Sequence, residues 1–285
     1  MPYKWAPVRQ RIRTGCGCGI APLRCSDNVK IATWNINSIK SRVQHVYNWA
    51  ERNQPDVLCL QETKCPDDKF PIQKLRPLGY EHQALFGERT YNGVAILSLF
   101  PIEKIQRNLP DDPANAQKRL IAGTVSGIHV VNVYAPHGTR LGSEKYTYKL
   151  NWIKRLRNYF DTQFKRKENV LLCGDLNVAP HELDVWKISV WRNKLHFTKA
   201  ERDAIQELKK WGFIDLFRQI NDDAKEFTWW DHFLHSVEMD KGLRLDHLWA
   251  SAPLAELCTD CWIDKKPRTL EHPSDHAPVI AEFAI

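Results

Sequence analysis

Hydrophobic residues along the chain alternate between short continuous runs and stretches with helical spacing. Five of the runs are nearly all apolar: Lys30–Asn37, Val57–Thr63, Gly93–Ser98, Ile128–Ala135 and Val170–Asn177. Such runs are typical of strands in sheets that are covered on both faces. We therefore predict these five segments to be buried strands.

The stretches between the runs carry apolar residues at the spacing of an amphipathic helix. Ile39–Asn53 places Val43, Val46 and Ala50 on one helical face, and Tyr146–Phe164 repeats this pattern. Residues three and four apart lie on the same side of a helix, so both stretches have one face to bury. We predict a helix over each of them.

The segment after residue 197 predicts the start of a third helix. Thr198 and Glu201 have the spacing of a capping box, and Gly212 follows the last helical residue, Trp211. Strands and helices alternate in this way from about residue 29 onward, without a Gly/Ser-rich linker. We therefore expect one α/β domain over residues 29–285, with residues 1–28 as a basic N-terminal tail.

The two halves of the predicted domain open in a similar way. A strand ends in Trp34-Asn-Ile-Asn37 in the first half, and another ends in Gly174-Asp-Leu-Asn177 in the second. This similarity suggests two stacked sheets of related layout, although it is too weak to define a sequence repeat.

Composition and charge exclude several classes of protein. The 285 residues are 43% hydrophobic and 26% charged, which is ordinary for a globular protein and excludes disordered and collagen-like chains. The net charge is +7, but residues 1–30 hold six basic residues against one acidic residue. The remainder holds 35 against 33 and is nearly neutral. An anionic partner must therefore meet a local patch of the domain, with the tail as an additional electrostatic arm.

Neither a membrane span nor a secretion signal is indicated. No run of 18 apolar residues is present, and the first 30 residues lack a continuous apolar core. We expect a cytoplasmic protein without a membrane partner. Disulfides are not expected in that compartment.

Cys258 and Cys261 form the only C-x-x-C motif of the body. They lie within Leu257–Asp264, which we predict to be a strand. Residues three apart on a regular strand face opposite sides of the sheet. We therefore expect these two thiols to face apart and not to bind one metal ion.

Polar side chains lie at the ends of six predicted strands, where a loop does not require them. These residues are Asn35, Asn37, Gln61, Glu62, Tyr134, Asp175, Asn177, Asp246, Asp275 and His276. Individually they have ordinary explanations, as turn residues, a buried aromatic or a surface ion pair. In covered α/β sheets, however, ligands bind outside the carboxyl ends of strands. Together they favour one shared site.

The ordered motifs resemble those of the exonuclease III family of abasic-site endonucleases, within the endonuclease/exonuclease/phosphatase superfamily. They are Trp34-Asn-Ile-Asn, Leu60-Gln-Glu-Thr-Lys, Asn92-Gly-Val-Ala, Asn132-Val-Tyr-Ala-Pro, Gly174-Asp-Leu-Asn, Arg244-Leu-Asp and Pro273-Ser-Asp-His-Ala-Pro. The resemblance covers residues 29–285. It implies a four-layered α/β sandwich, in which two packed, mainly antiparallel or mixed sheets are flanked by helices.

Hydrolysis of a phosphodiester requires a nucleophilic water, neutralisation of charge on the phosphate and help for the leaving oxygen. Oxygen ligands suit Mg²⁺, with Mn²⁺ as a substitute. The resemblance implies that Glu62 is the principal ligand. The further residues expected at the metal site are Asn37, Asp175, Asn177, Asp275 and His276.

The resemblance also implies catalytic roles. His276 would act on the phosphate or the water, and Asp246 would hold its imidazole in the working tautomer. Asp175 would orient or deprotonate the attacking water, or would supply the proton of the leaving group; both alternatives stay open.

Contacts to the substrate follow from the same resemblance. Asn35, Tyr134 and Asn177 would hydrogen-bond the scissile phosphate, because neutral donors bind an oxyanion without competing with the metal. Arg140, six residues beyond Tyr134, is expected to contact the DNA backbone. His137 is a departure from the family pattern, in which an amide is common at this position.

Trp229, Leu243 and Leu245 match the family's apolar pocket for a flipped abasic sugar, whose walls reject a nucleotide that still carries its base. The alternative for Trp229 is an ordinary core aromatic. His196 stands where relatives often carry a small residue. We hypothesise that its ring crowds a continuous strand and favours nicked or recessed 3′ ends; the alternative is an exposed loop histidine.

The sequence thus predicts a monomeric, Mg²⁺-dependent hydrolase of base excision repair. Its expected substrate is double-stranded DNA with abasic sites, nicks or blocked 3′ ends, with 3′-phosphatase, 3′-phosphodiesterase and 3′→5′ exonuclease activity. One alternative is a superfamily phosphatase acting on a phosphorylated lipid or small molecule. Another is a non-catalytic DNA-binding module, against which the complete set of polar site residues argues.

Overall fold

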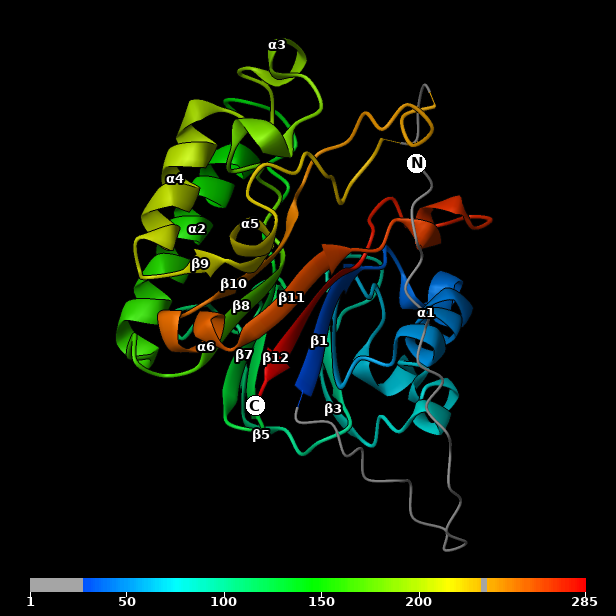
Figure 1. Ribbon diagram of the computed structural model, residues 1–285. Helices are drawn as coiled ribbons and strands as arrows, with labels where there is room; N and C mark the ends of the chain where they lie inside the picture. Colours follow the sequence, from blue (N-terminus) through cyan, green and yellow to red (C-terminus); the bar gives the residue numbers. More distant parts are fainter. Residues whose placement is uncertain (1–27, 232–234) are drawn as a thin grey trace, which may run out of the picture.

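The computed structural model describes residues 28–231 and 235–285. The predicted basic tail, residues 1–28, lies outside this part of the chain except for Asn28. Figure 1 shows two twisted sheets packed face to face with helices on their outer sides. The predicted four-layered α/β sandwich is confirmed.

The first sheet has six strands in the order β11-β12-β1-β2-β4-β3. Their bounds are β1 Asn28–Asn35, β2 Val57–Gln61, β3 His82–Phe86, β4 Val94–Ser98, β11 Cys258–Ile263 and β12 Val279–Ala284. β1 runs parallel to β2 and antiparallel to β12. Both ends of the described chain therefore pair at the centre of this sheet.

The second sheet also has six strands, in the order β5-β6-β7-β8-β10-β9. Their bounds are β5 Glu103–Arg107, β6 Leu120–Val125, β7 Ile128–Tyr134, β8 Val170–Asp175, β9 Ile214–Asp215 and β10 Asp246–Ala250. β7 and β8 are parallel, whereas β8 and β10 are antiparallel. This sheet is therefore mixed, like the first.

Helices cover the outer faces of both sheets. The α-helices are α1 Ile39–Asn53, α2 Glu144–Gln163, α3 Ile188–Trp191, α4 Lys199–Lys209, α5 Leu216–Ile220 and α6 Ala252–Glu256. Short 3₁₀ turns are η1 Asp67–Lys69, η2 Ile72–Lys74, η3 Arg76–Leu78, η4 Glu182–Asp184 and η5 Lys266–Thr269. α1 packs on the first sheet, and α2 and α4 pack on the second.

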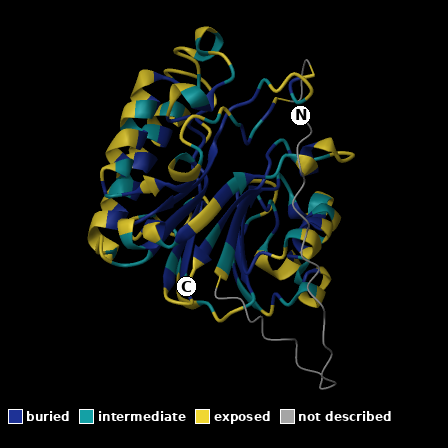
Figure 2. Ribbon diagram, viewed as in Figure 1, coloured by how far each residue is buried: buried dark blue, intermediate teal, exposed yellow. Residues whose placement is uncertain are grey.

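Burial follows this layering. Figure 2 shows buried residues along the strands and exposed residues on the outer sides of the helices. One core cluster lies between the sheets, and two others lie between a sheet and its helices. Strands buried on both faces explain why their sequences are nearly all apolar rather than alternating.

A buried polar network connects the two sheets within the central core. Nε2 of Gln61 donates to Oγ1 of Thr33 at 2.8 Å and to Oδ1 of Asn132 at 2.7 Å. Nδ2 of Asn132 in turn donates to the carbonyls of Leu60 and Ala95. Satisfied polar groups in a low-dielectric core are directional, so they fix how one sheet lies on the other. Gln61 directly precedes Glu62 in the sequence, and Asn132 lies two residues before Tyr134.

The local predictions hold with small shifts at the boundaries. The first helix has the predicted bounds, and the Thr198–Glu201 capping box is present at the start of α4. Four of the five predicted strands end one or two residues early, and the fifth, Gly93–Ser98, ends at Ser98 as predicted. Among the described residues, no helix has both the length and the apolar character needed to cross a membrane.

The expectation that the thiols of Cys258 and Cys261 face apart is wrong. A register shift between Cys258 and Asp260 interrupts the pairing of β11 with β12. A bulge inserts one extra residue, so residues 258 and 261 face the same side of the sheet although they are three positions apart. Both thiols lie in the core between the sheets. Both cysteines are free.

Candidate active site

Strand register brings the polar residues together at one edge of the sandwich. Asn35 pairs with Gln61 across the parallel β1–β2 ladder, which places Glu62 next to Asn35. In the second sheet, Asp175 pairs with Tyr134 of β7 on one side and with Asp246 of β10 on the other. Because these pairings lie at the strand ends, both sheets deliver polar side chains to the same place.

Asn35 connects the two halves of the site directly. Its Nδ2 donates to Oε1 of Glu62 at 2.9 Å and to Oδ2 of Asp175 at 3.0 Å. Glu62 directly follows β2 of the first sheet, and Asp175 is the last residue of β8 in the second sheet. A single amide thus spaces two carboxylates that would otherwise repel each other.

His276 lies between two carboxylates. Its Nδ1 is 2.7 Å from Oδ2 of Asp246, and its Nε2 is 3.8 Å from Oδ2 of Asp175. All three side chains are buried. Asp246 is fixed in turn by Thr228, whose Oγ1 accepts a hydrogen bond from its backbone N–H. Because a carboxylate only accepts, Nδ1 carries a proton and Nε2 is directed toward Asp175.

The charges of Asp175, Asp246 and His276 shift one another's pKa values. Burial lowers the pKa of His276, but the carboxylates of Asp246 and Asp175 outweigh burial and raise it. Burial raises the pKa of Asp175, and the Asp246 carboxylate raises it further, against the effect of His276. His276 therefore favours the cationic form, which stabilises negative charge on a phosphate, and Asp175 is suited to exchanging a proton.

Three site residues have left-handed backbone conformations. Asn37, Glu62 and Asn177 have φ angles of 44°, 49° and 53°. Asparagine adopts this region readily, whereas glutamate does so at a cost. Asn177 is stabilised by its neighbour, since its backbone N–H donates to Oδ1 of Asp175 at 2.8 Å. The turn after each strand thus directs a polar side chain back over the strand end.

The residues present fit a divalent cation. Asp175, Asp246 and His276 offer ligand atoms that all lie within 4.8 Å of one another. Within the described part of the chain, Oδ1 of Asp246 is buried without a hydrogen-bond partner. On the other side of Asn35, the ammonium of Lys64 lies 2.8 Å from Glu62 Oε2 and 2.6 Å from Asn37 Oδ1. The Glu62 and Asn37 oxygens thus already surround a cation and are the ligand type that Mg²⁺ prefers, whereas His276 could coordinate a metal only in its neutral form.

Asp275 and Tyr134 complete the cluster of predicted residues. Nδ2 of Asn37 donates to Oδ1 of Asp275, and Nε1 of Trp229 donates to its Oδ2 at 3.0 Å. Burial raises the pKa of Tyr134, and the carboxylates of Glu62 and Asp175 raise it further, so its hydroxyl stays protonated and can donate.

Three of the remaining predicted residues line a hollow beside the site, of about 490 Å³. Arg140, His196 and Trp229 lie on its wall, and we call it the Trp229 hollow. Leu243 and Leu245 are buried behind Trp229 in the same apolar cluster and do not line the hollow. The abasic pocket stays a prediction, with Trp229 as its accessible wall.

His196 is not an exposed loop residue; only 5% of it is accessible. Its Nδ1 lies 2.7 Å from the carbonyl of Asn177, so this nitrogen carries the proton. Its ring packs edge-on against His137, with centroids 4.7 Å apart, and lies 6.1 Å from the ring of Trp229. His196 therefore connects the turn after β8 to the Trp229 hollow.

A buried ion pair that the sequence motifs do not reveal lies behind the loop of His196. Nζ of Lys149 on α2 donates to the carbonyl of Asn177 at 2.7 Å, to that of His137 at 3.3 Å and to the carboxylate of Glu201. Glu201 also accepts from the backbone N–H of His196. A lysine three residues before the buried Trp152, on the apolar face of α2, was the available signal.

Arg119 was missed as well. Its guanidinium lies over the ring of Tyr134, 4.8 Å from the centroid, and donates to the Tyr134 carbonyl at 3.2 Å. No motif marks this arginine, because its role depends on the pairing of β6 with β7.

Comparison with known proteins agrees with this geometry. The model of the endonuclease/exonuclease/phosphatase family matches residues 32–276. Exodeoxyribonuclease III of Haemophilus influenzae is 34% identical, over 90% of this chain and 100% of its own. The DNA repair nuclease APEX1 of Danio rerio is 31% identical, over 90% of this chain and 83% of its own.

Solved structures agree too. An AP endonuclease from Archaeoglobus fulgidus has a TM-score of 0.87 and 40% identity, covering 90% of this chain and 100% of that one. The 3′ phosphatase NExo from Neisseria, bound to a product DNA hairpin, has a TM-score of 0.87 and 39% identity. The match covers 90% of this chain and 99% of that one. The chain therefore belongs to the endonuclease/exonuclease/phosphatase family and, within it, to the exonuclease III group.

Proposed function

We propose that this protein is a Mg²⁺-dependent DNA repair nuclease that hydrolyses phosphate esters at abasic sites and at blocked 3′ ends. The observation that carries the proposal is the linked group of Glu62, Asn35, Asp175, His276 and Asp246, in which both sheets supply part of one site. Relatives that share this fold are named as exodeoxyribonuclease III, AP endonuclease and 3′ phosphatase.

The proposed chemistry divides between the two sides of Asn35. Glu62, with Asn37 and Asp275, would hold Mg²⁺, which supplies Lewis-acid stabilisation of charge on the phosphate and leaving oxygen. Cationic His276 and the neutral donors Asn177 and Tyr134 would bind the phosphate oxygens. Asp175 would orient the attacking water or exchange its proton, and Asp246 would keep His276 oriented.

The experiment uses labelled duplexes that contain an internal abasic analogue or a 3′-phosphate at a nick, with Mg²⁺ or with EDTA. We expect cleavage or phosphate release only with Mg²⁺. Asp175→Asn should abolish it, while Asp260→Asn, which changes an exposed carboxylate of β11, should not. Absence of activity on both duplexes with Mg²⁺ would refute the proposal.

A phosphatase for a phosphorylated lipid or small molecule is the second candidate, since the family includes phosphatases. A water-soluble inositol phosphate in the same assay tests it. Turnover of that compound without turnover of either duplex would favour the phosphatase. The Trp229 hollow with Arg140 at its wall favours a nucleic acid, because an aromatic beside a cation suits a sugar-phosphate chain.

A further inference from the structure

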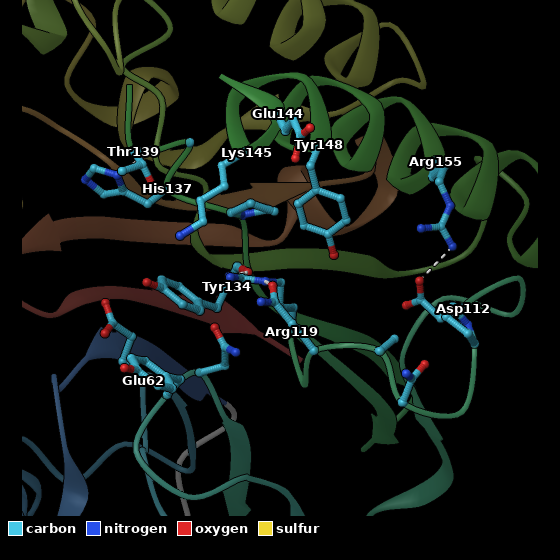
Figure 3. Close-up of a pocket in the computed structure, with 18 of the residues that line it drawn as sticks. Glu62, Asp112, Arg119, Tyr134, His137, Thr139, Glu144, Lys145, Tyr148 and Arg155 are labelled. Atoms are coloured by element: carbon cyan, nitrogen blue, oxygen red, sulfur yellow. Dashed lines mark hydrogen bonds and ion pairs between the residues drawn. The ribbon is translucent and has the colours of Figure 1, made fainter. Parts of the chain in front are cut away.

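A second cavity adjoins the active site, with a volume of about 600 Å³. It lies between the first turns of α2 and the 112–119 segment, and we call it the Tyr148 groove. Figure 3 shows Lys145 and Tyr148 pointing from α2 into it, toward Tyr134 and Arg119. The ion pair of Arg155 with Asp112 closes its far end.

The groove has aromatic and cationic walls. Tyr148 and Tyr91 are both exposed, at 37% and 69%. Among the described residues, neither Lys145 nor Arg119 forms an ion pair with a carboxylate, whereas Lys64 and Arg155 are paired. The unpaired positive charge lies between the active site and Tyr148. This combination suits a nucleotide, whose phosphate needs a cation and whose base stacks on an aromatic ring.

The groove is continuous with the catalytic residues. Glu62 and Tyr134 line it, and His137 lines both this groove and the Trp229 hollow. The two cavities therefore flank the position of the scissile phosphate. If the damaged group enters the Trp229 hollow, as the predicted abasic pocket implies, the nucleoside on the other side of the phosphate meets the Tyr148 groove.

We propose that the Tyr148 groove is a subsite for the nucleotide that carries the scissile phosphate on its 3′ oxygen and stays with the retained strand. This proposal rests on the proposed function. The base lies against Tyr148, and Lys145 contacts the backbone. A cavity of about 600 Å³ is the size of a small-ligand site and has room for one nucleotide. For its base to lie against Tyr148 the bound nucleotide must leave its pairing partner, so frayed or mismatched 3′ ends are preferred.

A binding test does not depend on turnover. The probe is deoxycytidine 3′-phosphate, titrated calorimetrically against the full chain, with inorganic phosphate as the reference ligand. We expect Tyr148→Ala to weaken binding of the nucleotide about tenfold and binding of phosphate hardly at all, whereas Tyr148→Phe keeps the ring and the affinity. Equal affinities of wild type and Tyr148→Ala for the nucleotide would overturn the proposal.

A kinetic test uses two nicked duplexes that differ only in whether the nucleotide bearing the 3′-phosphate is matched or mismatched. Wild type should release phosphate faster from the mismatched end, and Tyr148→Ala should lose that preference. Lys154→Ala, which removes an exposed lysine of the same helix away from the groove, is the control and should keep it. A wild type without the preference would overturn the inference, whereas inactivity on both duplexes would refute the proposed function and leave the binding test decisive.

Discussion

His276 and Asp246 are joined by a 2.7 Å hydrogen bond between partners that belong to different halves of the sandwich. Asp246 begins β10 of the second sheet, and His276 precedes β12 of the first. Nε1 of Trp34 donates to the carbonyl of His276 and holds its backbone to the first sheet. The orientation of the imidazole thus depends on how the two sheets pack, and not on one loop alone.

Asp246→Asn should reduce kcat about 100-fold or more and change KM little. The Asp246 carboxylate raises the pKa of His276, so an amide would favour the neutral imidazole, which stabilises charge on the phosphate less, and would orient the ring through a weaker hydrogen bond. Steady-state kinetics on a 3′-phosphate duplex measure this change. Asp264→Asn, which alters a carboxylate outside the site, is the control. A variant that loses less than tenfold in kcat would contradict the orienting role.

Glu62→Gln should raise the Mg²⁺ concentration needed for half-maximal activity by about tenfold or more. The carboxylate is the anionic ligand of its cluster, and an amide retains the shape without the charge. Burial raises the pKa of Glu62, but Lys64 and Asn35 outweigh it and lower the pKa, so the native side chain is ionised at neutral pH. Titration of activity with Mg²⁺ measures the shift. An unchanged Mg²⁺ dependence would place the principal ligand elsewhere.

Residues at strand ends could be predicted from sequence because they follow a strong local signal. Asn35, Glu62 and Asp175 each come directly after or at the end of an apolar run, so predicting the strand also predicts the position of the polar residue. Packing of two covered sheets then brings those ends together. The active-site cluster followed from strand prediction together with the ordered motifs.

Other features depend on contacts between segments that no local pattern encodes. His196 is buried because Lys149 and Glu201, from two different helices, organise its loop. The facing of Cys258 and Cys261 depends on one extra residue in β11, and a bulge has no clear signature in a short strand. These positions require the tertiary structure.

Lys149→Met should lower the free energy of unfolding by about 3–5 kcal/mol, because it leaves the Glu201 carboxylate buried without its partner. Both side chains are 0% exposed. The double variant Lys149→Met with Glu201→Gln removes both charges and should be more stable than the single variant. Urea unfolding of the three proteins measures the difference.

An exposed pair provides the comparison for this prediction. Lys199 and Asp203 are four residues apart on α4 and largely exposed. Lys199→Met should change the free energy of unfolding by about 0.5 kcal/mol or less, since water screens such pairs. If Lys149→Met lowered the free energy of unfolding no more than Lys199→Met, the buried pair would not organise the loop of His196.

His247 should make stability depend on pH. Its Nε2 donates to the carbonyl of Val178, and its Nδ1 accepts from Arg244, so protonation would break a hydrogen bond beside a fixed cation. Burial, and then the Arg244 charge, lower its pKa to about 4. The unfolded chain, with a histidine pKa of about 6.5, therefore binds this proton first, and stability is lost as pH falls from about 6.5 toward 4.

The comparison of wild type with His247→Gln isolates this effect. Between pH 8 and pH 5, wild type should lose about 2 kcal/mol more unfolding free energy than the variant. Other titrating groups, including His276, are common to both proteins and cancel in the difference. Urea titrations at the two pH values measure it. Equal losses would show that His247 is protonated equally in the folded and unfolded chains.

His196→Gly should raise incision at internal abasic sites about tenfold relative to removal of a 3′-phosphate. The ring lies between His137 and Trp229 at the Trp229 hollow, where a strand that continues past the lesion would have to pass. A terminal phosphate needs no such passage, so removal of the ring should help only the continuous strand. The φ angle of 73° is accessible to glycine, and the variant should therefore fold. His272→Gly, at an exposed histidine with φ of 49°, is the matched control and should leave the ratio unchanged. A ratio unaffected by His196→Gly would show that the ring does not select between the two substrates.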